Sequence, residues 1–142
     1  MRILGLDVGD RRIGIALSDS LGITAQPLLV LERRGAGRDV DAVGRLIEQH
    51  GVTAVVVGLP LTMRGERGVQ ANKVIAFSEA LRRRTPVPVQ WLDERLTTAQ
   101  GERALIEAGA SRRARKRAID QVAAQLILQQ FLDTQRASGS PA

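Results

Sequence analysis

The stretch that decides the fold lies at the N-terminus, where the chain reads Arg-Ile-Leu-Gly-Leu-Asp-Val from Arg2 to Val8 and Arg-Ile-Gly-Ile-Ala-Leu-Ser from Arg12 to Ser18. The first run is almost wholly apolar, which is typical of a strand buried on both faces of a sheet. In the second run Ile13, Ile15 and Leu17 alternate with smaller or polar residues, as in a strand. Because only the turn signal Gly9-Asp10 separates the two runs, we expect an antiparallel β-hairpin.

Outward from this hairpin, the sequence alternates between strand and helix patterns. We expect further strands over residues 25–33, 53–59 and 87–92. Helical periodicity predicts one helix from Asp39 to the stop signal Gly51 and a second over residues 69–84. The residues between the β-branched strand 53–59 and the second helix, 60–68, form a polar loop.

The last third of the chain is predicted to be mainly helical. Thr97 and Gln100 have capping-box spacing and predict a helix that ends at Ala108. A basic, polar stretch covers residues 111–117, and a strongly amphipathic helix covers residues 117–135. The order β-β-β-α-β-α-β-α-α predicts an α/β fold with a mixed five-stranded sheet flanked by helices, which is the order of the ribonuclease H-like architecture. We expect one domain over residues 1–136 and a disordered tail over residues 137–142.

Composition excludes several kinds of site. The 142 residues are 44% hydrophobic and 25% charged, which is typical of a single soluble domain. The sequence has no cysteine and only one histidine, His50, so disulfides, thiol nucleophiles and multi-histidine metal sites are excluded. No apolar run is long enough for a membrane span or a signal peptide, and we therefore expect a cytoplasmic protein with no membrane partner.

The charge balance suggests a polyanionic partner. Lys and Arg number 21 against 15 Asp and Glu, which gives a net charge of +6. Lys73 and Lys116 are the only lysines, so the surplus consists of arginine. Guanidinium groups bind phosphate with two parallel hydrogen bonds, which favours nucleic acid as the partner.

Acidic residues at three places in the chain are candidates for catalysis. Asp7 interrupts the first apolar strand, Asp93 and Glu94 follow the fifth strand, and Asp120 lies at the edge of the apolar stripe of the final helix. Taken singly, each has an ordinary reading, as a turn cap, a partner of Arg95, or a surface charge. In the predicted fold, however, one carboxylate on the first strand, one at the end of the fifth strand and one on the final helix converge. Carboxylate oxygens suit Mg²⁺ or Mn²⁺, and a pair of such ions can cleave a phosphodiester.

Basic residues stand beside these acids. Arg11 and Arg12 follow Asp7, and Arg95 follows Glu94. A denser cluster precedes Asp120 and consists of Arg112, Arg113, Arg115, Lys116 and Arg117. We expect these side chains to bind substrate phosphates, with a solvated charged loop as the alternative for the dense cluster.

Four blocks of sequence resemble the YqgF/RuvX family, whose members are similar to RuvC-type Holliday junction resolvases. The blocks are Leu6-Asp7-Val8-Gly9 with Arg12-Ile13-Gly14, then Val57-Gly58-Leu59-Pro60, then Asp93-Glu94-Arg95-Leu96-Thr97-Thr98, and then Asp120-Gln121-Val122-Ala123-Ala124 with Ile127-Leu128-Gln129. The resemblance implies the ribonuclease H-like fold and a metal-dependent nuclease. Bacterial members of the family are described as nucleases that trim the 5′ end of the precursor of 16S ribosomal RNA, and the resemblance implies this role for the chain.

The resemblance places the family's catalytic acids on Asp7, Glu94 and Asp120, and leaves open whether Asp93 contributes. RuvC relatives carry an acid on the fourth strand, where this chain has Gly58. They also carry two acids on the last helix, where Ala123 and Ala124 follow Asp120 here. Both departures weaken any transfer of junction-resolving specificity.

Three other functions compete with the processing of ribosomal RNA. A DNA nuclease or Holliday junction resolvase would use the same chemistry, and a junction enzyme would have to be a dimer, whereas the sequence does not decide between monomer and homodimer. A non-catalytic RNA-binding assembly factor would explain the charge equally well. The segment Asp7-Val8-Gly9 ahead of Gly14 also resembles the phosphate loop of sugar kinases, but 142 residues leave no room for their second lobe.

Overall fold

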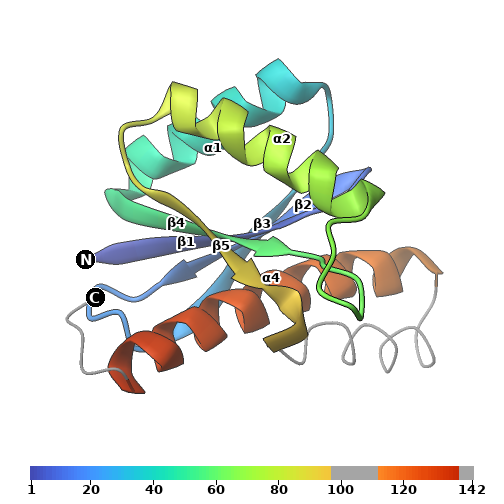
Figure 1. Cartoon of the computed structure of the whole chain (residues 1–142). Coiled ribbons are helices and arrows are strands. Elements are labelled where there is room, and N and C mark those ends of the chain that lie inside the picture. The colour runs from blue at the N-terminus through green and yellow to red at the C-terminus, as the bar shows by residue number, and fades with distance from the viewer. Residues whose placement is uncertain (97–111, 138–142) are drawn as a thin grey trace.

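A mixed five-stranded sheet forms the centre of the computed structural model, which describes residues 1–96 and 112–137, without the side chains of Leu96 and residues 112–121. The strands lie in the order β3-β2-β1-β4-β5 (Figure 1). Their bounds are Arg2–Val8 for β1, Arg12–Ser18 for β2, Ala25–Glu32 for β3, Val52–Leu59 for β4 and Val89–Asp93 for β5. β1, β2 and β3 pair antiparallel, whereas β4 and β5 run parallel to β1. The predicted hairpin and mixed sheet are therefore confirmed.

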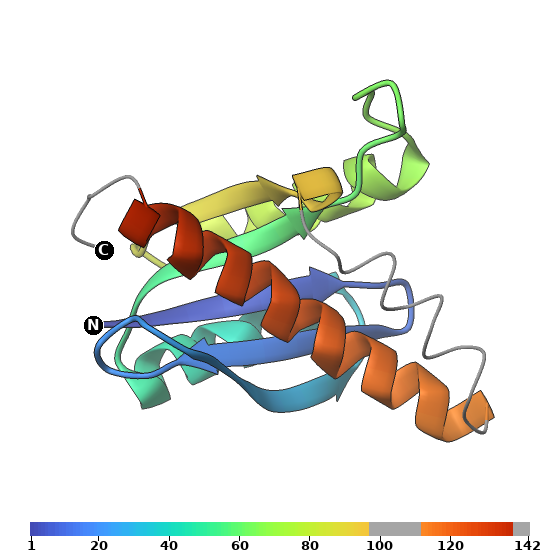
Figure 2. The same cartoon turned by 90° about the horizontal axis from the view of Figure 1, so that it is seen from below.

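Helices cover both faces of this sheet. α1 (Ala36–His50) and α2 (Val69–Arg84) lie on one face, and α4 (Arg112–Ala137) crosses the other (Figures 1 and 2). A short 3₁₀ turn, η1 (Glu94–Leu96), follows β5 directly. In the part of the chain that the structure describes, no helix has the length and apolar character needed to cross a membrane.

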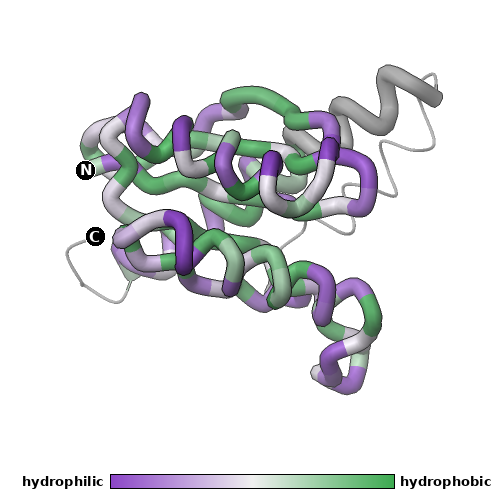
Figure 3. Tube along the Cα trace, turned by 90° about the horizontal axis from the view of Figure 1, so that it is seen from above, coloured by the Kyte–Doolittle hydropathy of each residue, from purple (hydrophilic) through white to green (hydrophobic). Residues whose placement is uncertain are grey.

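Each face of the sheet has its own apolar core. Leu4, Leu6 and Phe77 belong to the cluster under α1 and α2, whereas Ile3 and Ile127 belong to the cluster under α4. Viewed from above, hydrophobic residues alternate with hydrophilic ones along the chain, as expected for helices with one buried side (Figure 3). Full burial of one such side chain stabilises the fold by about 1.5–3 kcal/mol.

The start of α1 differs from the prediction. The helix begins at Ala36 rather than at Asp39, because the Asp39 carboxylate accepts hydrogen bonds from the N–H groups of Arg34 (2.9 Å) and Gly35 (3.3 Å). Gly35 has a φ of 131°, a conformation that favours glycine, and it immediately precedes the helix as its N-cap residue. The predicted stop at Gly51 is confirmed by its left-handed conformation.

Most other boundaries lie within two residues of the expectation. The bounds of α2 are confirmed, while β3 ends one residue early and β4 begins one residue early. β5 begins at Val89 rather than at residue 87, after Pro88, which has no N–H to donate to a neighbouring strand. The predicted helix over residues 97–108 lies outside the described residues.

The basic stretch 111–117 is expected to precede the final helix, and this is wrong from Arg112 onward. α4 begins there, five residues earlier than predicted, so the basic cluster occupies the first turns of the helix. Cations are unfavourable at the positive end of the helix dipole. Arginine and lysine are nevertheless good helix formers, and the helix continues through them.

Candidate active site

The structure brings Asp7 and Glu94 together in one pocket. Asp7 lies near the end of β1 and Glu94 directly follows β5, with β4 between these two strands. Because β1, β4 and β5 are parallel, their carboxyl ends meet at one edge of the sheet, where α/β proteins bind ligands. The pocket has a volume of about 220 Å³, and Gly58, Pro60 and Gln70 also line it. Asp7 is 7% exposed and Glu94 is 1% exposed.

Both carboxylates belong to the side of the sheet that α4 covers. Side chains alternate between the two faces of a strand, and Ile3 of β1 packs in the cluster under α4, so Asp7 lies on that face as well. Gly5, between these two residues, lies so close to α4 that a Cβ there would stand 2.7 Å from the Cβ of Leu128. α4 therefore closes over β1 immediately beside Asp7.

Gly58 makes room for Glu94. A Cβ at residue 58 would lie 2.4 Å from Cδ1 of Ile127 and 3.1 Å from Cγ of Glu94. Real Cβ atoms essentially never approach another heavy atom as closely as the first of these distances. The space beside Gly58 is therefore filled by side chains from α4 and from η1.

Asp93 is held by Arg95 and does not line the pocket. Its carboxylate accepts hydrogen bonds from the Arg95 guanidinium at 2.7 and 3.1 Å and from the Arg95 N–H at 3.0 Å. The side-chain hydrogen bond from Arg95 holds the pKa of Asp93 below its ordinary value. Of the two neighbouring acids, Glu94 therefore lines the pocket with Asp7, whereas Asp93 pairs with Arg95. Arg95 is one of the residues that the sequence predicted to bind phosphate.

Two further predicted phosphate ligands are not part of this pocket. Arg12 pairs with Glu32 on the neighbouring strand β3, with Nε 3.1 Å from Oε1. Arg11 is exposed in the turn between β1 and β2, where its carbonyl accepts a hydrogen bond from the N–H of Arg33. Neither Arg11 nor Arg12 lines the Asp7–Glu94 pocket.

The remaining predicted site residues lie on α4. Asp120 stands four residues before Ala124, whose carbonyl lies near Gly5 of β1. The cluster of Arg112, Arg113, Arg115, Lys116 and Arg117 occupies the first turns of the same helix. The side chains of Asp120 and of this cluster lie outside the described part of the structure.

The sequence did not indicate two polar residues of the pocket. Asp10 lines it from the β1–β2 turn, and Gln70 lines it from the first turn of α2, where its amide donates a 3.4 Å hydrogen bond to the Val8 carbonyl. The only available signal for Gln70 was its position at the start of the helix that follows β4. Asp10 was interpreted only as part of a turn.

The donors in the pocket suit a hard cation. Carboxylate oxygens are the ligands that Mg²⁺ and Mn²⁺ prefer, and the absence of cysteine excludes thiolate ligands. Among the described side chains, no group of three or more His, Cys, Asp or Glu is placed to hold a metal ion. Asp7 and Glu94 together offer two carboxylates to this pocket.

Comparisons with known proteins agree over the whole domain. The RuvX family model, described as "Holliday junction resolvase", matches residues 1–134. A relative from Desulforudis audaxviator is 47% identical over 137 residues, which cover 96% of this chain and 97% of the relative. A relative from Moorella thermoacetica is 51% identical over 133 residues, covering 94% and 95%. Both relatives carry the name "Putative pre-16S rRNA nuclease".

Solved structures confirm the ribonuclease H-like fold. RuvC of T. thermophilus in complex with a Holliday junction substrate superposes with a TM-score of 0.64 at 18% identity, over 100% of this chain and 99% of RuvC. The fowlpox virus Holliday junction resolvase gives a TM-score of 0.55 at 12% identity, over 94% and 99%. From the family match and the close relatives, we conclude that the chain belongs to the RuvX family.

Proposed function

We propose that this protein is a metal-dependent nuclease that processes the 5′ end of the precursor of 16S ribosomal RNA. The observation that carries the proposal is the convergence of two buried carboxylates, Asp7 and Glu94, in one pocket at the carboxyl edge of the sheet. Burial of a carboxylate costs free energy that a bound cation can offset, so such a pair is expected where an ion binds. The names of the close relatives support ribosomal RNA as the substrate.

Asp7, Glu94 and Asp120 would hold the ions, Mg²⁺ or Mn²⁺. Asp120 lies four residues before Ala124 and seven before Ile127, and these spacings place the three residues on one face of a helix. Ala124 and Ile127 are buried against the sheet, and this burial supports Asp120 as the third carboxylate. When bound, such ions activate a water molecule and stabilise the leaving oxygen of the phosphodiester.

The chain itself would position the substrate. The basic cluster at the start of α4 begins eight residues before Asp120, so phosphates bound along it would lie near the carboxylates. The ion pair with Asp93 holds the Arg95 guanidinium in one position, so this group would lose little conformational freedom on binding a phosphate.

A Holliday junction resolvase is the second candidate, because the family description and the fold of RuvC both favour it. The residue at position 58 argues against it. RuvC relatives resemble this chain but have an acid at this position on the fourth strand, and an acidic side chain there would displace Ile127 or Glu94. A non-catalytic RNA-binding factor would have no need for the two buried carboxylates, Asp7 and Glu94, at the carboxyl ends of the strands.

A side-by-side cleavage assay separates these functions. A ribosomal RNA precursor, single-stranded DNA and a four-way DNA junction are incubated with the protein and Mg²⁺ or Mn²⁺, and the solution mass of the protein is measured in parallel. We expect cleavage of the RNA near its mature 5′ end. Cleavage of the junction alone, by a dimer, would establish the resolvase instead, and cleavage of none would favour the binding factor.

A further inference from the structure

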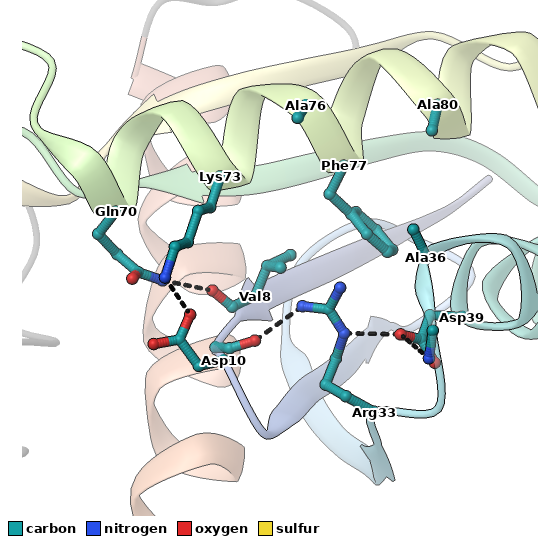
Figure 4. Close-up of a pocket in the computed structure, with 12 residues that line it drawn as sticks. Val8, Asp10, Arg33, Ala36, Asp39, Gln70, Lys73, Ala76, Phe77 and Ala80 are labelled. Atoms are coloured by element: carbon teal, nitrogen blue, oxygen red, sulfur yellow. Dashed lines mark hydrogen bonds and ion pairs between the residues drawn. The ribbon is translucent and has the colours of Figure 1, made fainter.

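A second cavity lies beside the candidate active site, on the opposite face of the sheet. It has a volume of about 490 Å³ and opens between the start of α1, the exposed side of α2 and the β1–β2 turn (Figure 4). Four residues line both this cavity and the Asp7–Glu94 pocket, namely Val8, Gly9, Asp10 and Gln70. A ligand that occupied the pocket could therefore extend into the cavity around the end of β1.

The wall of the cavity suits a flat aromatic ring. Ala36, Ala76 and Ala80 provide small apolar surfaces from the two helices. Between them, the guanidinium of Arg33 lies 5.4 Å from the centre of the Phe77 ring. Planar guanidinium groups stack on unpaired bases in protein–RNA complexes. The cavity thus offers both an apolar wall and a planar cation to a base.

Arg33 is fixed in place before any ligand binds. Its Nε donates a 2.7 Å hydrogen bond to Asp39, and its Nη1 donates a 2.8 Å hydrogen bond to the carbonyl of Gly9 (Figure 4). Asp39 is buried, and its side chain also holds the start of α1. Little conformational freedom would be lost when a base stacks against this guanidinium.

The rim of the cavity carries an exchangeable cation. Lys73 on α2 contacts Asp10 at 3.2 Å, and the two side chains are 55% and 62% exposed. An exposed ion pair of this kind contributes little stability, so a phosphate can compete with Asp10 for the ammonium group. Asp10 itself belongs to the wall that the cavity shares with the active-site pocket.

We propose that this cavity binds one unpaired nucleotide of the substrate strand, next to the scissile phosphate, with its base against Arg33 and its phosphate on Lys73. The inference rests on the proposed nuclease function and adds the form of the substrate to it. A base that enters a cavity between two helices cannot remain paired in a duplex. The protein should therefore prefer a strand with an unpaired extension over a fully paired one.

The test measures binding rather than cleavage, in the Asp7→Asn background so that the RNA stays intact. Two fluorescent RNA hairpins that differ only in a short unpaired extension are titrated, and affinities are obtained from anisotropy. We expect about tenfold tighter binding of the extended hairpin, as stacking of one base provides. Lys73→Gln and Ala76→Glu should each abolish most of that preference.

Matched variants on the same helix control for charge. Arg83→Gln removes a cation and Asn72→Glu adds an anion at exposed positions of α2 outside the cavity, and both should keep the preference. Equal affinity for the two hairpins, or an equal loss with the control variants, would overturn the proposal. So would binding of free adenosine 5′-monophosphate without any preference for the extended hairpin. If the parent protein cleaves none of the test substrates but the preference for the extended hairpin is present, the nucleotide-binding cavity is supported and the proposed nuclease function is overturned.

Discussion

Cδ1 of Ile127 on α4 occupies the space beside Gly58 on β4, so that a methyl group at residue 58 would lie 2.4 Å from it. Because the core is close-packed, Gly58→Ala should destabilise the protein by about 1–3 kcal/mol. It should also lower cleavage activity, since the same methyl group would press on Cγ of Glu94 at 3.1 Å. Urea denaturation measures the first effect. The double variant Gly58→Ala/Ile127→Val, which removes Cδ1, should recover part of the stability, and no recovery would contradict this packing.

The contact between Gly5 and α4 predicts a second stability effect. A Cβ at Gly5 would lie 2.7 Å from the Cβ of Leu128, which cannot move without its helix, so Gly5→Ala should cost about 1–3 kcal/mol. Gly37 in the first turn of α1 is the matched control, because nothing lies within 4 Å of its would-be Cβ. Gly37→Ala should stabilise the protein by up to about 1 kcal/mol, and thermal unfolding distinguishes the two.

The two neighbouring acids at the end of β5 should respond differently to neutralisation. Glu94 lines the pocket with Asp7, and Glu94→Gln should lower cleavage by more than about 100-fold, beyond the loss typical of residues that only orient metal ligands. Asp93→Asn removes a charge that faces Arg95 and should keep activity within about tenfold of the parent. Initial rates at saturating Mg²⁺ provide the comparison. The reverse ranking would show that Asp93 is the ligand.

Asp39 predicts how stability depends on pH. Burial alone raises the pKa of this carboxyl, but the hydrogen bonds from the Arg34 N–H and the Arg33 guanidinium outweigh burial and hold the pKa below its ordinary value. The resulting stabilisation is present above the unfolded-state pKa of about 4 and is lost as the pH falls through the lower folded-state pKa.

Asp39→Asn should therefore cost about 2 kcal/mol at pH 7 and less near pH 3. The half-exposed Asp41, which pairs with Arg45 and Arg84, serves as the control, and Asp41→Asn should cost less than about 1 kcal/mol. Urea denaturation at both pH values tests this. A loss for Asp39→Asn that is the same at pH 3 as at pH 7 would refute the assigned role of the carboxylate.

Periodicity predicted the sheet and α2 well, because the period of a buried strand or an amphipathic helix is a local property of the sequence. It was less accurate at the starts of two helices. The Asp39 carboxylate starts α1 three residues early, and the helical segment from Arg112 continues against its dipole. Hydrophobic periodicity contains neither effect.

The candidate site was predictable in part. Asp7 stood out as a charge in an apolar strand, and the strand order placed Glu94 near it. The choice of Glu94 over Asp93 depends on the contact with Arg95, and the need for glycine at residue 58 depends on Ile127. The cavity at Arg33 and Lys73 joins residues from three separate segments, so no single motif could have indicated it.

The most direct test of the metal-dependent site is a divalent-metal titration with Asp7→Asn as the control. Cleavage of a ribosomal RNA precursor is measured against Mg²⁺ and Mn²⁺ concentration for the parent and the variant, and RNA affinity is measured for both. We predict that the parent cleaves only with metal, and that the variant loses cleavage while it binds the RNA as tightly as the parent. Undiminished cleavage by Asp7→Asn, or cleavage by the parent without divalent metal, would contradict the assignment of this site.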